Sequence, residues 1–263
     1  MYNYLEPIHH KAWKDNNYLK IPGFFSDEEV TQLQQWVAEI EGWELTNDKW
    51  MHHFESTPEG TRLSRSENFV PYHAGMKKTL TGGKVLQVVS ELMGEPAVLY
   101  KEKINYKYPG GGGYAAHQDA PAYEFVKFHI TCLISVDTAT VESGCLSFVP
   151  GQYQPRFIAL DENGCIASEV ASEMKWVDVP TQPGDILLFG SYIPHKSESN
   201  RSSQPRRIIY VTYNARSEGD WREKYYDDKR QTFLQYRKAN SMQTAQISKI
   251  AHFQGRTVLN HEK

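Results

Sequence analysis

Residues 97–120 read AVLYKEKINYKYPGGGGYAAHQDA, and the character of the chain changes at the start of this stretch. A run of strand-forming residues ends at Pro109 and is followed by four consecutive glycines. Further β-rich runs lie between turn signals at 127–137, 144–151, 175–180, 184–190 and 206–215. Short strands in series, with no helix between them, are typical of sandwiches and closed barrels. The sequence therefore predicts a mainly β (α+β) fold with a core of the jelly-roll kind.

Helices are expected on both sides of this β-rich part. Ser26 and Glu29 form a capping-box pattern at the start of one helix, and a second is expected over 82–94. The mixed charges of EGDWREKYYDDKR (218–230) favour a solvated helix face with surface ion pairs. We expect a single domain, with a helical cover over about 1–96, a β core over about 97–215 and a C-terminal helical segment over about 216–263.

The overall composition narrows the class of protein. The chain has 263 residues, 40% hydrophobic and 23% charged, with a formal net charge of −3. It has no basic stripe for nucleic acid, no apolar run long enough for a bilayer and no signal-peptide pattern at its start. Three cysteines without C-x-x-C spacing indicate packing residues rather than disulfides or zinc ligands. We expect a cytoplasmic protein that binds a small molecule, with no nucleic-acid or membrane partner; monomer or homo-oligomer stays open.

The motif HQD at 117–119 predicts a metal site. Residues i and i+2 of an extended strand point to one face, so His117 and Asp119 would project together. An imidazole and a carboxylate suit a divalent transition metal, which needs at least a third ligand. His195 supplies it, since it follows the turn and apolar strand of QPGDILLFG (182–190). The resulting facial triad leaves three coordination positions open on Fe(II).

Two adjacent arginines, Arg206 and Arg207, open the strand that begins eleven residues after His195. Neighbouring strand residues point to opposite faces, so one arginine should face the core and the other solvent. A guanidinium that faces the core needs an anionic partner, and its planar fork matches a carboxylate. The distal carboxylate of 2-oxoglutarate would be such a partner. This cosubstrate could occupy two iron positions and leave the third for O2.

These motifs, together with GCLSFVPGQY (144–153) and PGDILLFGSYIPHKSES (183–199), resemble the phytanoyl-CoA dioxygenase family over about residues 97–215. The family comprises Fe(II)/2-oxoglutarate oxygenases built on a double-stranded β-helix, and the resemblance implies this fold and chemistry. It implies three catalytic iron ligands, namely His117, Asp119 and His195. An acid at position 119 implies hydroxylation or another oxidation rather than halogenation, because related halogenases carry Gly or Ala there.

The resemblance also assigns residues around the cosubstrate and the substrate. It selects Arg206 over Arg207 for the 2-oxoglutarate C5 carboxylate and implies further cosubstrate contacts from Ser197, Asn105 and Thr131. Polar or aromatic residues expected at the substrate are Lys103, Gln118, Tyr114, Tyr123 and Tyr108. Alternatives stay open at several positions: Ser197 and Asn105 could cap a turn or strand edge, Lys101 competes with Lys103, and His129 is expected to be a core histidine.

The polar character of these residues favours a small polar or zwitterionic substrate. GGGGYAAHQDAPAY (110–123) and YNARSEGDWREKYYDDKR (213–230) resemble a bacterial sub-branch that hydroxylates 2-aminoethylphosphonate or its N-trimethyl analogue, with release of succinate and CO2. The alternatives are the same chemistry on an amino acid, betaine or secondary metabolite, a cupin-type metalloenzyme that does not use 2-oxoglutarate, and a non-catalytic binding module. The glycine run could be a mobile turn over the substrate or a tight hairpin.

Overall fold

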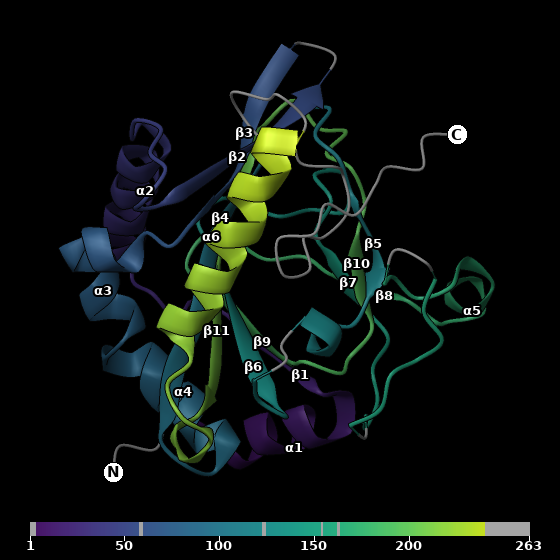
Figure 1. Ribbon diagram of the computed structural model, residues 1–263. Helices are drawn as coiled ribbons and strands as arrows, with labels where there is room; N and C mark the ends of the chain where they lie inside the picture. Colours follow the sequence, from purple (N-terminus) through teal and green to yellow (C-terminus); the bar gives the residue numbers. More distant parts are fainter. Residues whose placement is uncertain (1–3, 58–59, 123–124, 154, 162–163, 240–263) are drawn as a thin grey trace.

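The strands form two antiparallel sheets that pack face to face (Figure 1). The computed structural model describes residues 4–57, 60–122, 125–153, 155–161 and 164–239. The larger sheet has the order β1-β9-β6-β11-β4-β3-β2 and the smaller one the order β5-β10-β7-β8. The jelly-roll core expected from the series of short strands is therefore present.

The bounds of the elements follow the chain. The larger sheet contains β1 (Tyr18–Ile21), β2 (Met51–Thr57), β3 (Gly60–Glu67), β4 (Ala97–Lys107), β6 (His129–Ser135), β9 (Ile186–Gly190) and β11 (Arg206–Ala215). The smaller sheet contains β5 (Tyr114–His117), β7 (Leu146–Phe148), β8 (Val177–Val179) and β10 (His195–Ser197). The helices are α1 (Pro7–Asn16), α2 (Asp27–Glu41), α3 (Ala74–Leu80), α4 (Gly83–Met93), α5 (Ser168–Ser172) and α6 (Arg222–Ala239), with 3-10 turns at Val70–Tyr72, Ala120–Ala122 and Arg216–Glu218.

Alternation along the central strands creates two hydrophobic layers. On β11, Ile209 and Val211 pack with α2 and α4 on the outer face of the larger sheet, the side on which Figure 1 shows these helices. Ile208 and Tyr210 point the other way and pack with the smaller sheet. Both faces of β11 are thus covered, which explains why its sequence is a continuous apolar run rather than an alternating one.

Helix α2 begins as the sequence predicts. The Ser26 side chain accepts a hydrogen bond from the Glu29 backbone N–H, and the Glu29 carboxylate accepts one from the Ser26 backbone N–H. Helix α4 ends at Gly94, which adopts the left-handed conformation (φ 78°) that glycine tolerates best. Both predicted helices are confirmed within one or two residues.

The expected helical cover over about 1–96 is present as α1 to α4, but the expectation missed three strands, because this segment also contributes β1, β2 and β3 to the larger sheet. The second half of β3 is buried, yet its residues are polar: Ser64, Arg65, Ser66 and Glu67. A strand whose buried face is polar lacks the apolar alternation by which strands are recognised in a sequence. This polar face proves to lie beside the functional site.

Helix α6 has the solvated face that its charges predict, with a surface ion pair between Lys224 and Asp228, but its opposite face is buried. Tyr225, Tyr226 and Lys229 are buried against the larger sheet. The Tyr226 hydroxyl accepts a hydrogen bond from the Glu102 backbone N–H (3.0 Å) and donates one to the Glu102 carbonyl (2.8 Å). Pairing between β3 and β4 ends at Lys103, so the Glu102 backbone groups have no partner in β3. The Tyr226 hydroxyl takes the place of that partner strand. Across the described residues, no helix combines the length and apolar character that crossing a bilayer requires.

His129 is buried in β6, as expected of a core histidine, and its ring lies edge-on to Tyr100. Burial lowers its pKa from 6.5 to about 3, and nearby Lys101 acts in the same direction. The folded protein therefore holds this imidazole neutral, and unfolding takes up one proton between about pH 3 and pH 6.5.

We expect this proton uptake to make the metal-free protein sensitive to acid. The contribution of His129 to the free energy of unfolding is fully present above pH 6.5 and decreases as the pH falls, by about 2 kcal/mol between pH 8 and pH 5. In His129→Phe the free energy of unfolding should decrease by that much less over the same pH range. Urea unfolding with chelator present, at both pH values, measures it, and parallel losses in wild type and variant would contradict the assignment.

Candidate metal centre

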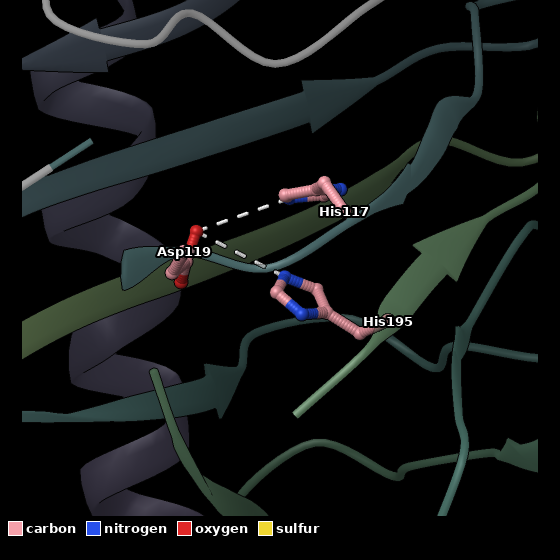
Figure 2. Close-up of side chains that lie close together, drawn as sticks. All are labelled: His117, Asp119 and His195. Carbon is pink, nitrogen blue, oxygen red and sulfur yellow. Dashed lines mark ion pairs between the residues drawn. The ribbon is translucent and has the colours of Figure 1, made fainter. Parts of the chain in front are cut away.

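Strand pairing in the smaller sheet brings the two predicted histidine ligands together. β5 and β10 run antiparallel with His117 opposite His195, and the ring centroids lie 4.1 Å apart. Asp119 lies just past the end of β5, and its Oδ1 is 3.8 Å from His117 Nε2 and 3.9 Å from His195 Nε2 (Figure 2). One ligand atom from each residue lies within 4.8 Å of the others, and all three residues are buried.

Hydrogen bonds fix which nitrogen of each imidazole faces the centre. His117 Nδ1 lies 2.7 Å from the Ala115 carbonyl, and His195 Nδ1 lies 3.1 Å from the Ile193 carbonyl. A carbonyl only accepts, so each Nδ1 carries the hydrogen and each Nε2 keeps its lone pair for a metal. Burial lowers the pKa of His117 to about 3, which keeps the ring neutral and ready to coordinate.

Asp119 supplies the negative charge of the triad. Burial opposes its ionisation, but His195, Lys101 and His117 outweigh burial and hold the pKa of the carboxyl below its usual range. Two neutral imidazoles and one carboxylate on one side of a buried centre fit Fe(II) with open positions opposite. The predicted triad therefore has the donor atoms, protonation and geometry that the metal requires.

A second polar site lies behind the triad, where β4 and β11 pair Lys107 with Arg206. Arg206 is fully buried; its Nη1 donates to the Gly144 carbonyl (2.8 Å), while Nε and Nη2 have no hydrogen-bond partner among the described residues. Lys107 Nζ donates to Ser197 Oγ at 2.9 Å. Buried guanidinium donors that lack a partner fit a ligand carboxylate, such as the distal end of 2-oxoglutarate.

Arg207 confirms the expected alternation. It is partly exposed on the opposite face of β11 and makes two 2.8 Å side-chain hydrogen bonds to Asp137. Of these two adjacent arginines, Arg206 is therefore the one that faces the interior.

The glycine run is packed against the segment that follows β10. Gly110 N–H donates to the Asn200 carbonyl (2.8 Å), and Asn200 N–H donates to the Gly111 carbonyl (3.0 Å). Gly110 has φ 75°, and a Cβ on Gly113 would lie 2.6 Å from the Ser197 carbonyl oxygen. Close backbone approach, which glycine alone allows here, favours the tight turn over a mobile lid.

A cavity opens beside the triad and gathers four of the predicted cosubstrate and substrate residues, Lys103, Asn105, Tyr114 and Thr131. Lining residues that the sequence did not suggest are Leu146, Phe189, Tyr210 and Thr212. All four predicted residues lie on strands, three of them in positions where side chains point away from the outer helices. Lys103 and Asn105, which the family resemblance singled out, line the cavity from the same face of β4.

Other predicted substrate residues lie elsewhere. The Gln118 amide is fully buried and bonds three backbone groups, the carbonyls of Tyr192 and Arg156 and the N–H of Ile158. The Tyr108 hydroxyl hydrogen-bonds Glu41 of α2, on the helical side. The structure thus brings neither side chain to the cavity, because each finds polar partners in the protein. Tyr123 lies outside the described residues.

Two buried basic residues near the cavity were missed by the sequence analysis. Lys107 was not singled out, although it lies on the same β4 face as Lys103 and Asn105. Arg65 of β3 lies before the expected β core, and it donates to Asn105 Oδ1 (3.2 Å) and to the Tyr114 hydroxyl (3.3 Å). No local pattern marks Arg65, since its role depends on β3 pairing with β4.

Comparison with known proteins identifies the family. The model of the phytanoyl-CoA dioxygenase family matches residues 13–208. The chain belongs to the phytanoyl-CoA dioxygenase family. Among curated members, methylphosphonate hydroxylase of Gimesia maris is 55% identical over 93% of this chain and 94% of its own. The 2-aminoethylphosphonate dioxygenase of uncultured bacterium HF130_AEPn_1 is 44% identical over 84% of this chain and 86% of its own.

Solved structures agree with this family assignment at the level of the fold. EctD from S. alaskensis, solved with 2-oxoglutarate and 5-hydroxyectoine, superposes with a TM-score of 0.69 at 18% identity, over 83% of this chain and 80% of its own. The epimerase SnoN, in complex with Fe3+, α-ketoglutarate and nogalamycin RO, gives 0.68 at 20% identity, over 79% and 82%. The predicted double-stranded β-helix is confirmed.

The predicted class, an Fe(II)/2-oxoglutarate-dependent dioxygenase, is confirmed by the family membership together with the buried triad. The cofactor set of iron, 2-oxoglutarate and O2 agrees with the three ligand atoms and the unpartnered guanidinium donors described above.

Proposed function

We propose that this dioxygenase hydroxylates a C–H bond of a small organophosphonate, with 2-oxoglutarate as cosubstrate and release of succinate and CO2. The observation that carries the proposal is the position of Lys103. Apart from the triad, it is the charged side chain among the described residues that line the cavity. A basic group at that position suits an anionic substrate. The substrates named for the two curated relatives, methylphosphonate and 2-aminoethylphosphonate, are both phosphonates.

In this proposal the iron held by the triad binds one end of the cosubstrate, and the second polar site, with Arg206 and Lys107, binds the other end. His117, Asp119 and His195 bind Fe(II), which when bound supplies the activation of O2 for the hydroxylation. Arg206 and Ser197, with Lys107, hold the C5 carboxylate of 2-oxoglutarate through charge-assisted hydrogen bonds. Asn105 and Thr131 line the cavity beside the triad and make the remaining cosubstrate contacts.

The walls of the cavity orient the substrate and exclude water. Tyr114 and Lys103 offer hydrogen-bond donors, and Leu146 and Phe189 present apolar surface near the two histidines. Donors on one wall and apolar groups on another would hold the phosphonate oxygens and leave a C–H bond directed at the metal. The long acyl chain of a thioester has no comparable apolar channel in this lining.

The proposal is tested by screening substrates for succinate release. Purified enzyme with Fe(II), 2-oxoglutarate and O2 is offered methylphosphonate, 2-aminoethylphosphonate, its N-trimethyl analogue, amino acids, betaines and acyl-thioesters. We expect stoichiometric succinate and a new 31P resonance with at least one phosphonate. Succinate formation with amino acids or betaines alone would overturn the phosphonate assignment, and oxidation without 2-oxoglutarate would favour the cupin-type alternative.

A small-molecule substrate is common to the curated relatives. The cytoplasmic location and the state of association, monomer or homo-oligomer, stay predictions from the sequence.

A further inference from the structure

Arg65 connects two residues of the cavity wall, although it is not among the described residues that line the cavity. It is buried, and β3 pairs it in register with Asn105 of β4. Its Nε donates to Asn105 Oδ1 (3.2 Å), and its Nη2 donates to the Tyr114 hydroxyl (3.3 Å). Asn105 belongs to the larger sheet and Tyr114 to β5 of the smaller one. One guanidinium group therefore joins the two sheets at the cavity.

Glu67 fixes the position of this guanidinium. Arg65 Nη1 lies 3.4 Å from Glu67 Oε1, and Glu67 also forms an ion pair with Lys229 of α6. Burial opposes the ionisation of Glu67, but its cationic neighbours, first of all Lys229, outweigh burial and hold the pKa of this carboxyl well below its usual range. A charged carboxylate on one side of the planar fork keeps the remaining donors in a constant direction.

The guanidinium decides the hydrogen-bond polarity of both wall residues, because it can donate but cannot accept. Asn105 turns its amide oxygen toward Arg65, and its NH2 group is left to donate on the other side. The Tyr114 oxygen accepts from Arg65, so its own hydrogen is directed elsewhere. An amide can turn over and a hydroxyl can rotate with little change in shape. Arg65 thus makes donors of two groups that can otherwise also accept.

We infer that Arg65 is a positioning residue for the hydroxylation, which holds Asn105 as a donor to 2-oxoglutarate and Tyr114 as a donor to the phosphonate. The inference rests on the proposed function, in which both ligands present oxygens that accept hydrogen bonds. A reversed amide or hydroxyl would place a lone pair against those oxygens. Donors that are fixed beforehand need no reorganisation when the ligands bind. Arg65 acts through its two partners and touches neither ligand.

The Asn105 half of the inference is tested by calorimetric titration of the anaerobic Fe(II) enzyme with 2-oxoglutarate. Arg65→Lys keeps the charge but loses the planar fork, and we expect about three- to tenfold weaker binding, the range of one hydrogen bond. Asn105→Ala should weaken binding by a similar factor. Because Arg65 acts through Asn105, the double variant should stay within about twofold of Asn105→Ala alone.

The Tyr114 half uses the same design with the phosphonate as ligand. Methylphosphonate and 2-aminoethylphosphonate are titrated into the anaerobic enzyme saturated with Fe(II) and 2-oxoglutarate. Tyr114→Phe removes only the hydroxyl and should weaken binding about tenfold, since the acceptor oxygen is charged. Arg65→Lys should weaken it about three- to tenfold, and adding it to Tyr114→Phe should cost less than about a further twofold.

Arg62→Lys is the matched control, because Arg62 lies on the same strand and is exposed. It should change neither affinity. Arg65→Met, in which Glu67 keeps its partner Lys229, replaces Arg65→Lys in both cycles if the lysine variant does not fold.

A merely structural role for Arg65 would lower the melting temperature without making the paired substitutions redundant. Losses that multiply in the double variants, or unchanged affinities in a folded Arg65 variant, would therefore overturn the inference. If wild type bound no phosphonate, the proposed function would fail, while the 2-oxoglutarate titrations would still decide whether Arg65 positions Asn105.

Discussion

Asp119→Ala is expected to reduce hydroxylation by more than about 100-fold, because residues that merely support metal ligands already account for 10–100-fold effects. The substitution removes the negative charge from a centre in which the other two donors are neutral imidazoles. It also removes one of the carboxylates, Asp119 and Glu67, that favour the charged forms of the buried Lys101 and Lys103. We therefore expect weaker Fe(II) binding as well as lost turnover.

Two measurements separate metal binding from catalysis in this variant. Anaerobic addition of Fe(II) and 2-oxoglutarate should give a weak visible charge-transfer band in wild type and a reduced one in Asp119→Ala. Asp178→Ala is a suitable control, because Asp178 lies exposed in the same small sheet and hydrogen-bonds Ser147. If Asp119→Ala hydroxylated its substrate at more than a tenth of the wild-type rate, Asp119 would be removed from the ligand set.

Arg206→Ala is expected to raise the 2-oxoglutarate concentration needed for half-maximal activity by roughly 100-fold. Loss of one partner of a buried charge-assisted pair costs about 2–5 kcal/mol, and 1.4 kcal/mol corresponds to a factor of ten. Iron binding should persist, since Arg206 does not belong to the triad. The effect should therefore fall on cosubstrate affinity rather than on the metal.

The neighbouring arginine is the matched control for this experiment. Arg207 has the same side chain one residue along β11, but it faces outward and pairs with Asp137. Arg207→Ala should change the 2-oxoglutarate requirement less than about threefold, because exposed ion pairs contribute little. Calorimetric titration of the Fe(II) enzyme with 2-oxoglutarate gives the affinities directly, and an unchanged value in Arg206→Ala would refute its assigned role.

The sequence was informative wherever a pattern is local. His117 and Asp119 lie two residues apart, and strand alternation is sufficient to place them on one side. Arg206 and Arg207 are distinguished by the same alternation once one face of β11 is known to be the interior. The capping box of α2 and the apolar runs of β6, β9 and β11 are equally local, and the structure contains each of them.

Long-range contacts explain what local patterns missed. Gln118 and Tyr108 are polar residues near the motif, but neither side chain lines the cavity. Gln118 hydrogen-bonds backbone groups, and Tyr108 hydrogen-bonds Glu41. The buried face of β3 is polar and carries no apolar periodicity. Lys229 looks like one charge of a solvated helix, yet α6 buries it against Glu67.

The sequence by itself indicated the jelly-roll core through its series of short strands. It indicated the iron-binding class through the His-x-Asp motif, His195 and their resemblance to a known family. Only the tertiary structure decided which charges gather near the cavity beside the triad. Arg65, Lys103 and Lys229 come from three elements far apart in the chain, and they meet because β3 pairs with β4 and α6 packs across it. Electrostatic interaction depends on distance in space, so a charge cluster of this kind has no signature in the order of the residues.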